Sequence, residues 1–210
     1  MRLPFISLEG GEGSGKDSIA KRIVPYLELT HEVINPREPG TTQLGEHMRN
    51  ILQYDYLAEP FCDEAEVLMF EVSRAQLVRQ VIKPALDAKK FVLCNRFADS
   101  TTAYQGYGRG LGADKMITLN NFAVGDYWPG LTLLYDVSVE EGQRRVGGRG
   151  EKLDRIEREA VAFHQRVRDG YLELADRFPD RIKVIRTDDL DEEGVWQVTQ
   201  GILQKEYNLR

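Results

Sequence analysis

The sequence predicts a single α/β domain in which helices flank a parallel β-sheet, and three features support this. The 210 residues match the size of one domain, short apolar runs alternate with amphipathic segments, and the first apolar run leads directly into a glycine-rich loop that opens a helix. Such alternation is typical of consecutive βα units, whose strands pair in parallel. No repeat, low-complexity stretch or interdomain linker interrupts it, so we expect one domain over residues 1–210.

Five short apolar runs are the predicted strands, because their length and composition suit strands buried within a parallel sheet. The first predicted helix follows the glycine-rich loop, with Ile19, Ile23 and Leu27 at helical spacing. Two further glycine-rich segments, residues 104–112 and 144–152, are predicted to be mobile loops. In chain order, the predicted strands are Phe5–Leu8, Glu32–Ile34, Phe91–Cys94, Leu131–Tyr135 and Ile182–Ile185.

The longest helical run, Glu64–Pro84, has apolar residues around most of its circumference, which predicts an interior helix. Arg74 breaks this pattern, because on a helical wheel it falls between Phe70, Val78 and Val81. An unpaired buried charge is costly, so Arg74 needs either an internal carboxylate or a bound ligand as its partner. We favour the ligand.

Composition argues against several classes of function. The chain has 28 Lys and Arg against 34 Asp and Glu, a net charge of -6, which disfavours a nucleic-acid polymer as partner. Cys62 and Cys94 lie far apart with no CxxC pattern, which disfavours a disulfide framework or a zinc site and fits a reducing cytoplasm. The first apolar run is too short for a signal peptide, and no run approaches the ~18 residues of a membrane span. We therefore expect a cytoplasmic protein with no membrane partner.

The glycine-rich loop has the spacing of a phosphate-binding loop and lies between the first strand and the first helix, as such a loop requires. Glycines let backbone N–H groups wrap around phosphate oxygens, while the helix N-terminus and the lysine add positive potential. A nucleoside triphosphate is the predicted ligand. The loop alone does not distinguish a GTPase, an ATPase or a kinase, although the guanine-reading NKxD motif is absent from the chain. Its residues are Gly10, Gly11, Glu12, Gly13, Ser14, Gly15 and Lys16.

The position after the lysine is unusual. Asp17 stands where a Ser or Thr normally ligates the magnesium that bridges the β- and γ-phosphates, and Ser18 follows it. A carboxylate about 4 Å from a phosphate charge would be repelled by roughly 4 kcal/mol at an effective dielectric of about 20. Asp17 must therefore bind the metal or point away, in which case it complements the helix N-terminus while Ser18 or water serves the metal. Both interpretations stay open.

Further motifs resemble the thymidylate kinase family, in its bacterial type. They are REPGTTQLGE (37–46), EVLMFEVSRAQLV (66–78) and NRFADSTTAYQGYGRG (95–110), together with LEGGEGSGK, GRGEKLDRIE and RVRDGYLELA, and they run in order from about Phe5 to Phe178. The resemblance implies a P-loop nucleoside monophosphate kinase fold with a five-stranded parallel sheet and a lid, at about residues 142–155. It also implies phosphoryl transfer from ATP to dTMP with magnesium, giving dTDP and ADP, and usually a homodimer.

The same resemblance implies the substrate contacts. Phe70 would stack on thymine, and Arg74 would bind a pyrimidine carbonyl. That carbonyl would be the ligand partner that a buried Arg74 needs. Arg37 and Arg96 would grip the dTMP phosphate, and Glu12 would receive the sugar 3'-hydroxyl. The remaining contacts are Ser100, Thr101 at the base edge, and Tyr104 with Gln105 near the deoxyribose, although Tyr104 also suits ordinary core packing.

The resemblance places a second group of cations in the lid, because the phosphate loop itself holds no arginine. We assign Arg149 to the transferring phosphoryl group and Arg145 to ATP, so that Lys16, Arg96, Glu12 and Arg149 form the predicted catalytic set. A solvated, charged helix end is the other interpretation of this cluster, which is weakened by Gly147 and Gly148. The cluster consists of Arg144, Arg145, Arg149, Lys152 and Arg155.

A second departure from the family pattern is Asn95, where most members have an aspartate that helps to hold magnesium. Asp136 is our second choice for that carboxylate. The third strand normally pairs beside the first, so we predict that Asn95 and Asp17 are linked, with Asp17 carrying the charge that Asn95 lacks and Ser18 completing the oxygen donors for Mg2+. Two alternatives stay open: a nucleotide-binding regulatory module with weak or lost catalysis, which rests on these departures, and a kinase for another deoxynucleotide.

Overall fold

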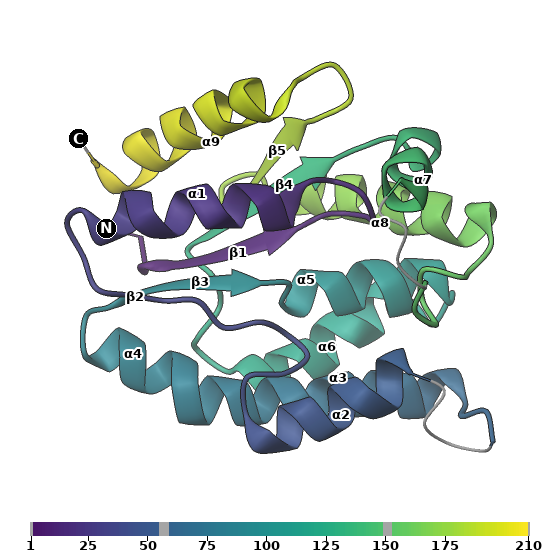
Figure 1. Ribbon diagram of the computed structural model, residues 1–210. Helices are drawn as coiled ribbons and strands as arrows, with labels where there is room; N and C mark the ends of the chain where they lie inside the picture. Colours follow the sequence, from purple (N-terminus) through teal and green to yellow (C-terminus); the bar gives the residue numbers. More distant parts are fainter. Residues whose placement is uncertain (1, 55–58, 149–152, 210) are drawn as a thin grey trace.

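The computed structural model describes residues 2–54, 59–148 and 153–209, and its centre is a five-stranded parallel sheet (Figure 1). Strand β1 (Phe5–Glu9) lies between β3 (Phe91–Asn95) and β4 (Leu131–Asp136), and the strand order is β2-β3-β1-β4-β5. The edge strands are β2 (Val33–Ile34) and β5 (Ile182–Arg186). The five predicted strands are confirmed with boundaries that differ by at most one residue, and β1 and β3 end at the same edge of the sheet.

Two helices, α1 (Lys16–Glu28) and α9 (Glu192–Tyr207), cover one face of the sheet (Figure 1). Side chains alternate along a strand, so Ile6 and Leu8 of β1 point to this face, where they pack with Ile23 of α1. The predicted apolar spacing of α1 is thus the spacing of its buried face.

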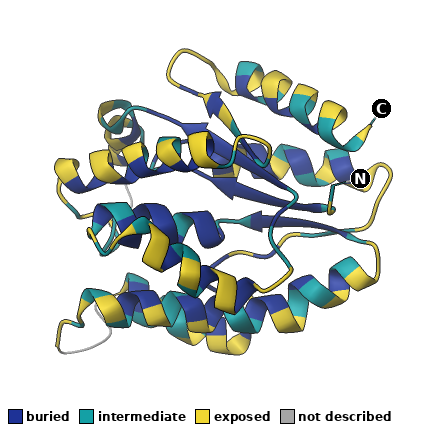
Figure 2. Cartoon of the chain, turned by 180° about the vertical axis from the view of Figure 1, so that it is seen from behind, coloured by how far each residue is buried: buried dark blue, intermediate teal, exposed yellow. Residues whose placement is uncertain are grey.

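The other face is covered by the remaining long helices, and here Phe5 packs with Val92 and Cys94 of β3. Figure 2 shows the strands as the most consistently buried part of the chain, with exposed residues on the outer sides of the helices. The covering elements are α3 (Asp63–Leu77), the π-helical turn η1 (Val78–Ile82), α4 (Lys83–Asp87), α5 (Ala98–Thr101), the π-helical segment η2 (Thr102–Gly108), α6 (Ala113–Val124) and α8 (Val161–Arg177). Outside these, α2 (Gln43–Gln53) packs on α3, and α7 (Val139–Gly147) follows β4.

Three predictions about local structure need correction. The helical run at 64–84 forms, but it is not wholly interior, because Leu68 and Val72 are 56% and 43% exposed. The predicted loop at 104–112 is wrong over residues 104–108, which belong to the largely buried helical segment η2. Residues 144–147 of the other predicted loop belong to α7, and residues 149–152 lie outside the described part of the chain. The glycines led to both loop predictions. In the structure, however, Gly106 and Gly108 allow the helical segment to pack closely on Met116 and Phe163.

Across residues 2–54, 59–148 and 153–209, no helix has both the length and the apolar character needed to cross a membrane.

Candidate active site

The glycine-rich loop connects β1 to α1, as predicted. Gly13 and Gly15 have φ angles of +73° and +83°, which residues with a Cβ rarely adopt, so the loop depends on glycine at these places. Gly15 is the N-cap of α1, and Lys16 is the first helical residue. Burial lowers the pKa of Lys16, and the nearby Arg96 guanidinium lowers it further, against the opposing carboxylate of Glu12. The loop thus presents a buried lysine at a helix N-terminus, which favours an anionic ligand.

A cavity of about 310 Å³ opens beside this lysine. It extends along the carboxyl end of β3 and between α3, α5 and η2, so that residues far apart in the sequence share one space. Such a site at the carboxyl ends of parallel strands is where α/β folds bind ligands. The predicted site residues that line it are Glu12, Lys16, Asp17, Arg37, Phe70, Arg74, Asn95, Arg96, Ser100, Thr101, Tyr104 and Gln105.

Arg96 and Glu12 form the charged centre of the cavity. The Arg96 Nη2 lies 2.6 Å from Glu12 Oε1, and its Nη1 donates to the carbonyl of Gly10 at 3.0 Å. The hydroxyl of Tyr104 donates to the same Glu12 oxygen at 2.8 Å, and the Arg96 guanidinium lies 5.0 Å from the Tyr104 ring centre. Burial favours a neutral Glu12, but Arg96, Lys16 and Tyr104 outweigh it and lower the pKa of Glu12 to about 2. Glu12 is therefore a carboxylate at neutral pH and accepts hydrogen bonds only.

Arg74 has the internal carboxylate partners that we ranked second to a ligand. Its guanidinium is 1% exposed and pairs with Glu71 at 2.6 Å and with Glu38. It also donates to Thr101 Oγ1 at 2.8 Å and to Asn120 Oδ1 at 2.6 Å. Burial opposes its charge, but the two carboxylates raise the pKa of Arg74. Our preference for a ligand as the sole partner was therefore wrong, while contact between Arg74 and a ligand in the cavity stays a prediction.

The two unusual positions, Asp17 and Asn95, are in contact. The amide Nδ2 of Asn95 donates a hydrogen bond to Asp17 Oδ1, because β3 lies directly beside β1 and Asp17 is in the first turn of the helix that follows β1. Asn95 Oδ1 is buried and has no hydrogen-bond partner among the described residues. The predicted proximity of these two side chains is confirmed.

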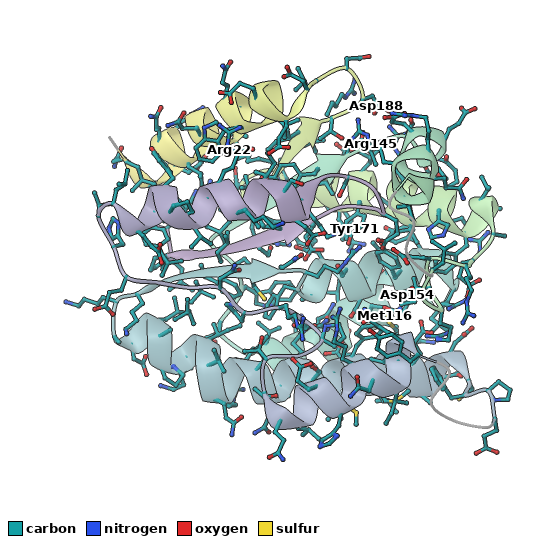
Figure 3. The ribbon with its side chains drawn as sticks, in the orientation of Figure 1. Arg22, Met116, Arg145, Asp154, Tyr171 and Asp188 are labelled. Atoms are coloured by element: carbon teal, nitrogen blue, oxygen red, sulfur yellow. The ribbon has the colours of Figure 1, made fainter. Side chains whose placement is uncertain are left out.

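Several predicted site residues lie elsewhere. Arg145 of α7 pairs with Glu141 at 2.7 Å and donates to the Thr187 carbonyl at 2.9 Å, close to the labelled Asp188 (Figure 3). It reaches the phosphate loop through the Gly13 carbonyl at 3.4 Å rather than through the cavity. Ser18 is exposed on α1 and is not part of the cavity lining. Arg149 and Lys152, predicted for the lid, lie outside the described residues.

The remaining candidates are held by ion pairs. Asp136, our second choice for a metal carboxylate, pairs with Arg168 at 2.7 Å and is not among the residues that line the cavity. Arg37 lines the cavity but is 55% exposed and pairs with Glu46 at 3.0 Å. Its side chain is therefore free to exchange a solvent-exposed partner for a ligand.

Sequence reasoning missed three buried carboxylates that bind side chains lining the cavity. Glu71, three residues before Arg74 on the same helix, could have been found from helical spacing. Glu66 is 1% exposed, accepts from Gln105 Nε2 at 2.7 Å and pairs with Arg109 and Arg155. Glu9 is fully buried at the end of β1. No local pattern distinguishes Glu66 or Glu9, because their partners lie on other elements.

Comparisons with known proteins identify one family. A family model described as Thymidylate kinase matches residues 8–197. Curated proteins named Thymidylate kinase are 51% identical in Kosmotoga olearia, over 86% of each chain, and 45% identical in Nostoc punctiforme, over 95% of each chain. The crystal structure of thymidylate kinase from Ehrlichia chaffeensis matches with a TM-score of 0.76 and 34% identity, covering 95% of this chain and 97% of that one.

Proposed function

Because the chain belongs to the thymidylate kinase family and phosphorylates dTMP to dTDP, we propose that the cavity is the dTMP site and that the adjoining glycine-rich loop holds ATP. One observation carries this assignment: Lys16 of the loop lines the same cavity as Phe70 and Arg74. A donor phosphate on the loop and an acceptor phosphate in the cavity would therefore meet without a barrier between them, as in-line transfer requires.

In the acceptor site, Arg96 and Arg37 bind the dTMP phosphate. Arg96 is preorganised, since Glu12 and the Gly10 carbonyl already fix its guanidinium. Glu12 stays ionised and accepts a hydrogen bond from the sugar hydroxyl, while Tyr104 closes the wall beside the deoxyribose. Phe70 supplies a stacking surface for the base.

The base edge meets the remaining acceptor residues. Arg74, Ser100, Thr101 and Gln105 line the cavity and provide hydrogen-bond donors and acceptors for the base. The Arg74 guanidinium is held by Glu38 and Glu71, so it can recognise a base carbonyl with little loss of side-chain entropy.

In the donor site, the backbone of residues 10–16 and the Lys16 ammonium bind the phosphates of ATP, next to Ser18 in the first turn of α1. Arg145 contacts both this loop and the segment after β5, which supports its assignment to ATP rather than to dTMP. Arg149 follows α7 in the sequence, and we assign it to the transferring phosphoryl group.

The residues beside the loop fit a magnesium ion. Mg2+ in kinases takes one or two carboxylates, water and substrate phosphates, and Asp17 with the unpartnered Oδ1 of Asn95 offers hard oxygen donors of this kind. Within residues 2–54, 59–148 and 153–209 there is no group of three or more Asp, Glu, His or Cys that would form a protein-only metal site. The ion would neutralise the negative charge of the donor phosphates. Asp17 and Asn95, held together by their hydrogen bond, would offer it oxygen ligands.

We extend the proposal to assembly and location. The outer face of α3 exposes Leu68 and Val72, which suits a homodimer built on this helix. Both cysteines are free thiols, as expected for an enzyme of the cytoplasm.

The test is release of ADP by the purified protein with ATP and Mg2+, using dTMP, dUMP, dCMP and thymidine as acceptors. We expect turnover largely confined to dTMP. Binding of dTMP and ATP is titrated in parallel, so that an inactive protein is distinguished from an empty one. Turnover with another acceptor in preference to dTMP would overturn the assignment of the cavity.

A further inference from the structure

The geometry points to Glu9 as a positioning residue that fixes Arg96 for recognition of the dTMP phosphate, an inference that rests on the role proposed above for Arg96. Glu9 is the last residue of β1 and is 0% exposed. It is not among the residues that line the cavity, so it acts through its neighbours and not on the substrate.

The Glu9 carboxylate accepts three hydrogen bonds, two from the start of α5 and one from α8. Its Oε1 accepts from the backbone N–H of Phe97 at 2.8 Å. Its Oε2 accepts from Ser100 Oγ of α5 at 2.5 Å and from the hydroxyl of Tyr171 of α8 at 3.0 Å. Tyr171 extends from α8 towards the end of β1 (Figure 3). All three partners donate to Glu9, so its side chain is the common acceptor that joins α5 and α8, although burial and the nearby Asp99 raise the pKa of Glu9 to about 7.

The conformation of Arg96 explains why such an anchor is needed. Its φ angle is +62°, in the left-handed region that residues with a Cβ seldom adopt, and this conformation persists only where the surroundings enforce it. The N–H of Arg96 donates to the carbonyl of Leu8 at 3.0 Å, and the next N–H, of Phe97, donates to Glu9 Oε1. Two consecutive residues of β1 therefore hold the backbone on both sides of the strained position.

The direction of the Arg96 side chain follows from this backbone. Its guanidinium reaches the Gly10 carbonyl and the Glu12 carboxylate at the mouth of the phosphate loop. Nη1 also lies 3.4 Å from both Ser100 Oγ and Tyr171 Oη, the two hydroxyls that Glu9 binds. Glu9 thus controls the backbone of Arg96 and the hydroxyls beneath its guanidinium.

Positioning and simple electrostatics predict opposite results for conservative substitutions. A carboxylate close to a bound phosphate repels it, so electrostatics alone predicts that Glu9→Gln strengthens dTMP binding and that Glu9→Asp changes little. Positioning depends on the reach of the side-chain oxygen. Gln keeps an oxygen at the distance of Oε1, whereas Asp is one methylene shorter and withdraws from the N–H of Phe97.

The experiment measures dissociation constants of dTMP, thymidine and ATP for the whole enzyme carrying Glu9→Asp or Glu9→Gln. We expect Glu9→Asp to weaken dTMP binding about tenfold, the scale of a lost hydrogen bond to a charged group. Glu9→Gln is expected to stay within about threefold of the wild type for dTMP. Thymidine lacks the phosphate, so its binding should change by less than about twofold in both variants, as should that of ATP.

Arg96→Met is the reference variant. It should lose the preference for dTMP over thymidine, and Glu9→Asp added to it should weaken dTMP binding no further. If Arg96→Met keeps that preference, the proposed role of Arg96 fails. If Arg96→Met loses it while Glu9→Asp binds dTMP normally, weakens thymidine equally, or is milder than Glu9→Gln, the positioning role of Glu9 is overturned and the proposed function stands.

Discussion

At the residue scale, the contact between Asp17 and Asn95 gives a physical reason for two departures from the family motif. An amide can donate to a carboxylate, whereas two carboxylates at this distance would repel each other or share a proton. Lys16, with its ammonium 3.8 Å from the Asp17 carboxylate, helps to lower the pKa of Asp17, although burial opposes the charge. The pair therefore keeps one negative charge beside the loop, on α1 instead of β3.

We predict that Asp17→Thr and Asn95→Asp each lower kcat by about tenfold or more, while the double variant recovers to within about threefold of the wild type. Asp17→Thr removes the charge, and Asn95→Asp alone places two carboxylates in contact. The double variant has one hydroxyl and one carboxylate, with the charge on β3. Steady-state kinetics at several Mg2+ concentrations measure the cycle, and losses that multiply in the double variant would show that the two positions act independently.

At the element scale, α7 and the phosphate loop pack so closely that glycine is required on both sides. A Cβ on Gly142 of α7 would lie 2.4 Å from the carbonyl oxygen of Glu12, and one on Gly13 would lie 2.3 Å from the carbonyl of Gly142. Both obstacles are backbone atoms, which cannot move without shifting the element that carries them. The position of α7 is therefore coupled to the shape of the loop.

Gly142→Ala should consequently weaken ATP binding by about tenfold and destabilise the fold by ~1–3 kcal/mol, as overpacking does. Gly147→Ala is the matched control on the same helix, because a Cβ there meets nothing within 4 Å. It should leave ATP binding unchanged and should not lower the melting temperature. Equal ATP affinities and melting temperatures for the two variants would contradict the coupling between α7 and the loop.

The elements themselves were largely predictable, but the contacts between them were not. Strand ends, the loop and α1 follow from local periodicity and glycine spacing, which are properties of neighbouring residues. The need of Arg74 for a partner also followed from its helix, yet Glu38 lies 36 positions away and can be found only once α3 has been docked. Tyr171 and Glu9 are 162 positions apart, so a single sequence holds no signal for their contact. At 104–108, local glycine content predicted a loop, because the packing that buries this segment comes from α6 and α8, which lie far away in the sequence.

At the scale of the whole molecule, helix α3 contributes both to the cavity and to an exposed apolar surface. The inner side of α3 carries Arg74 into the cavity, while its outer side exposes Leu68 and Val72, four residues apart and thus neighbours on one surface. Leu44 of the adjoining α2 is 39% exposed. Exposed apolar side chains that are neighbours on one helix are what a subunit interface uses, and such an interface would brace the helix that lines the proposed dTMP site.

We therefore expect the wild type to sediment at twice the 24.0 kDa of one chain. Leu68→Asp combined with Val72→Asp should shift it to the mass of one chain, because charges in an apolar interface are left unpaired. The melting temperature at low protein concentration should change little, since both side chains are exposed in the single chain.

Phe122→Asp is the control, because Phe122 is 88% exposed on α6 and its replacement should leave the mass unchanged. If the interface braces α3, the monomeric variant will also show a higher KM for dTMP with an unchanged KM for ATP. A wild type that sediments as one chain at every concentration, or a double variant that keeps the dimer mass, would exclude this face as the interface.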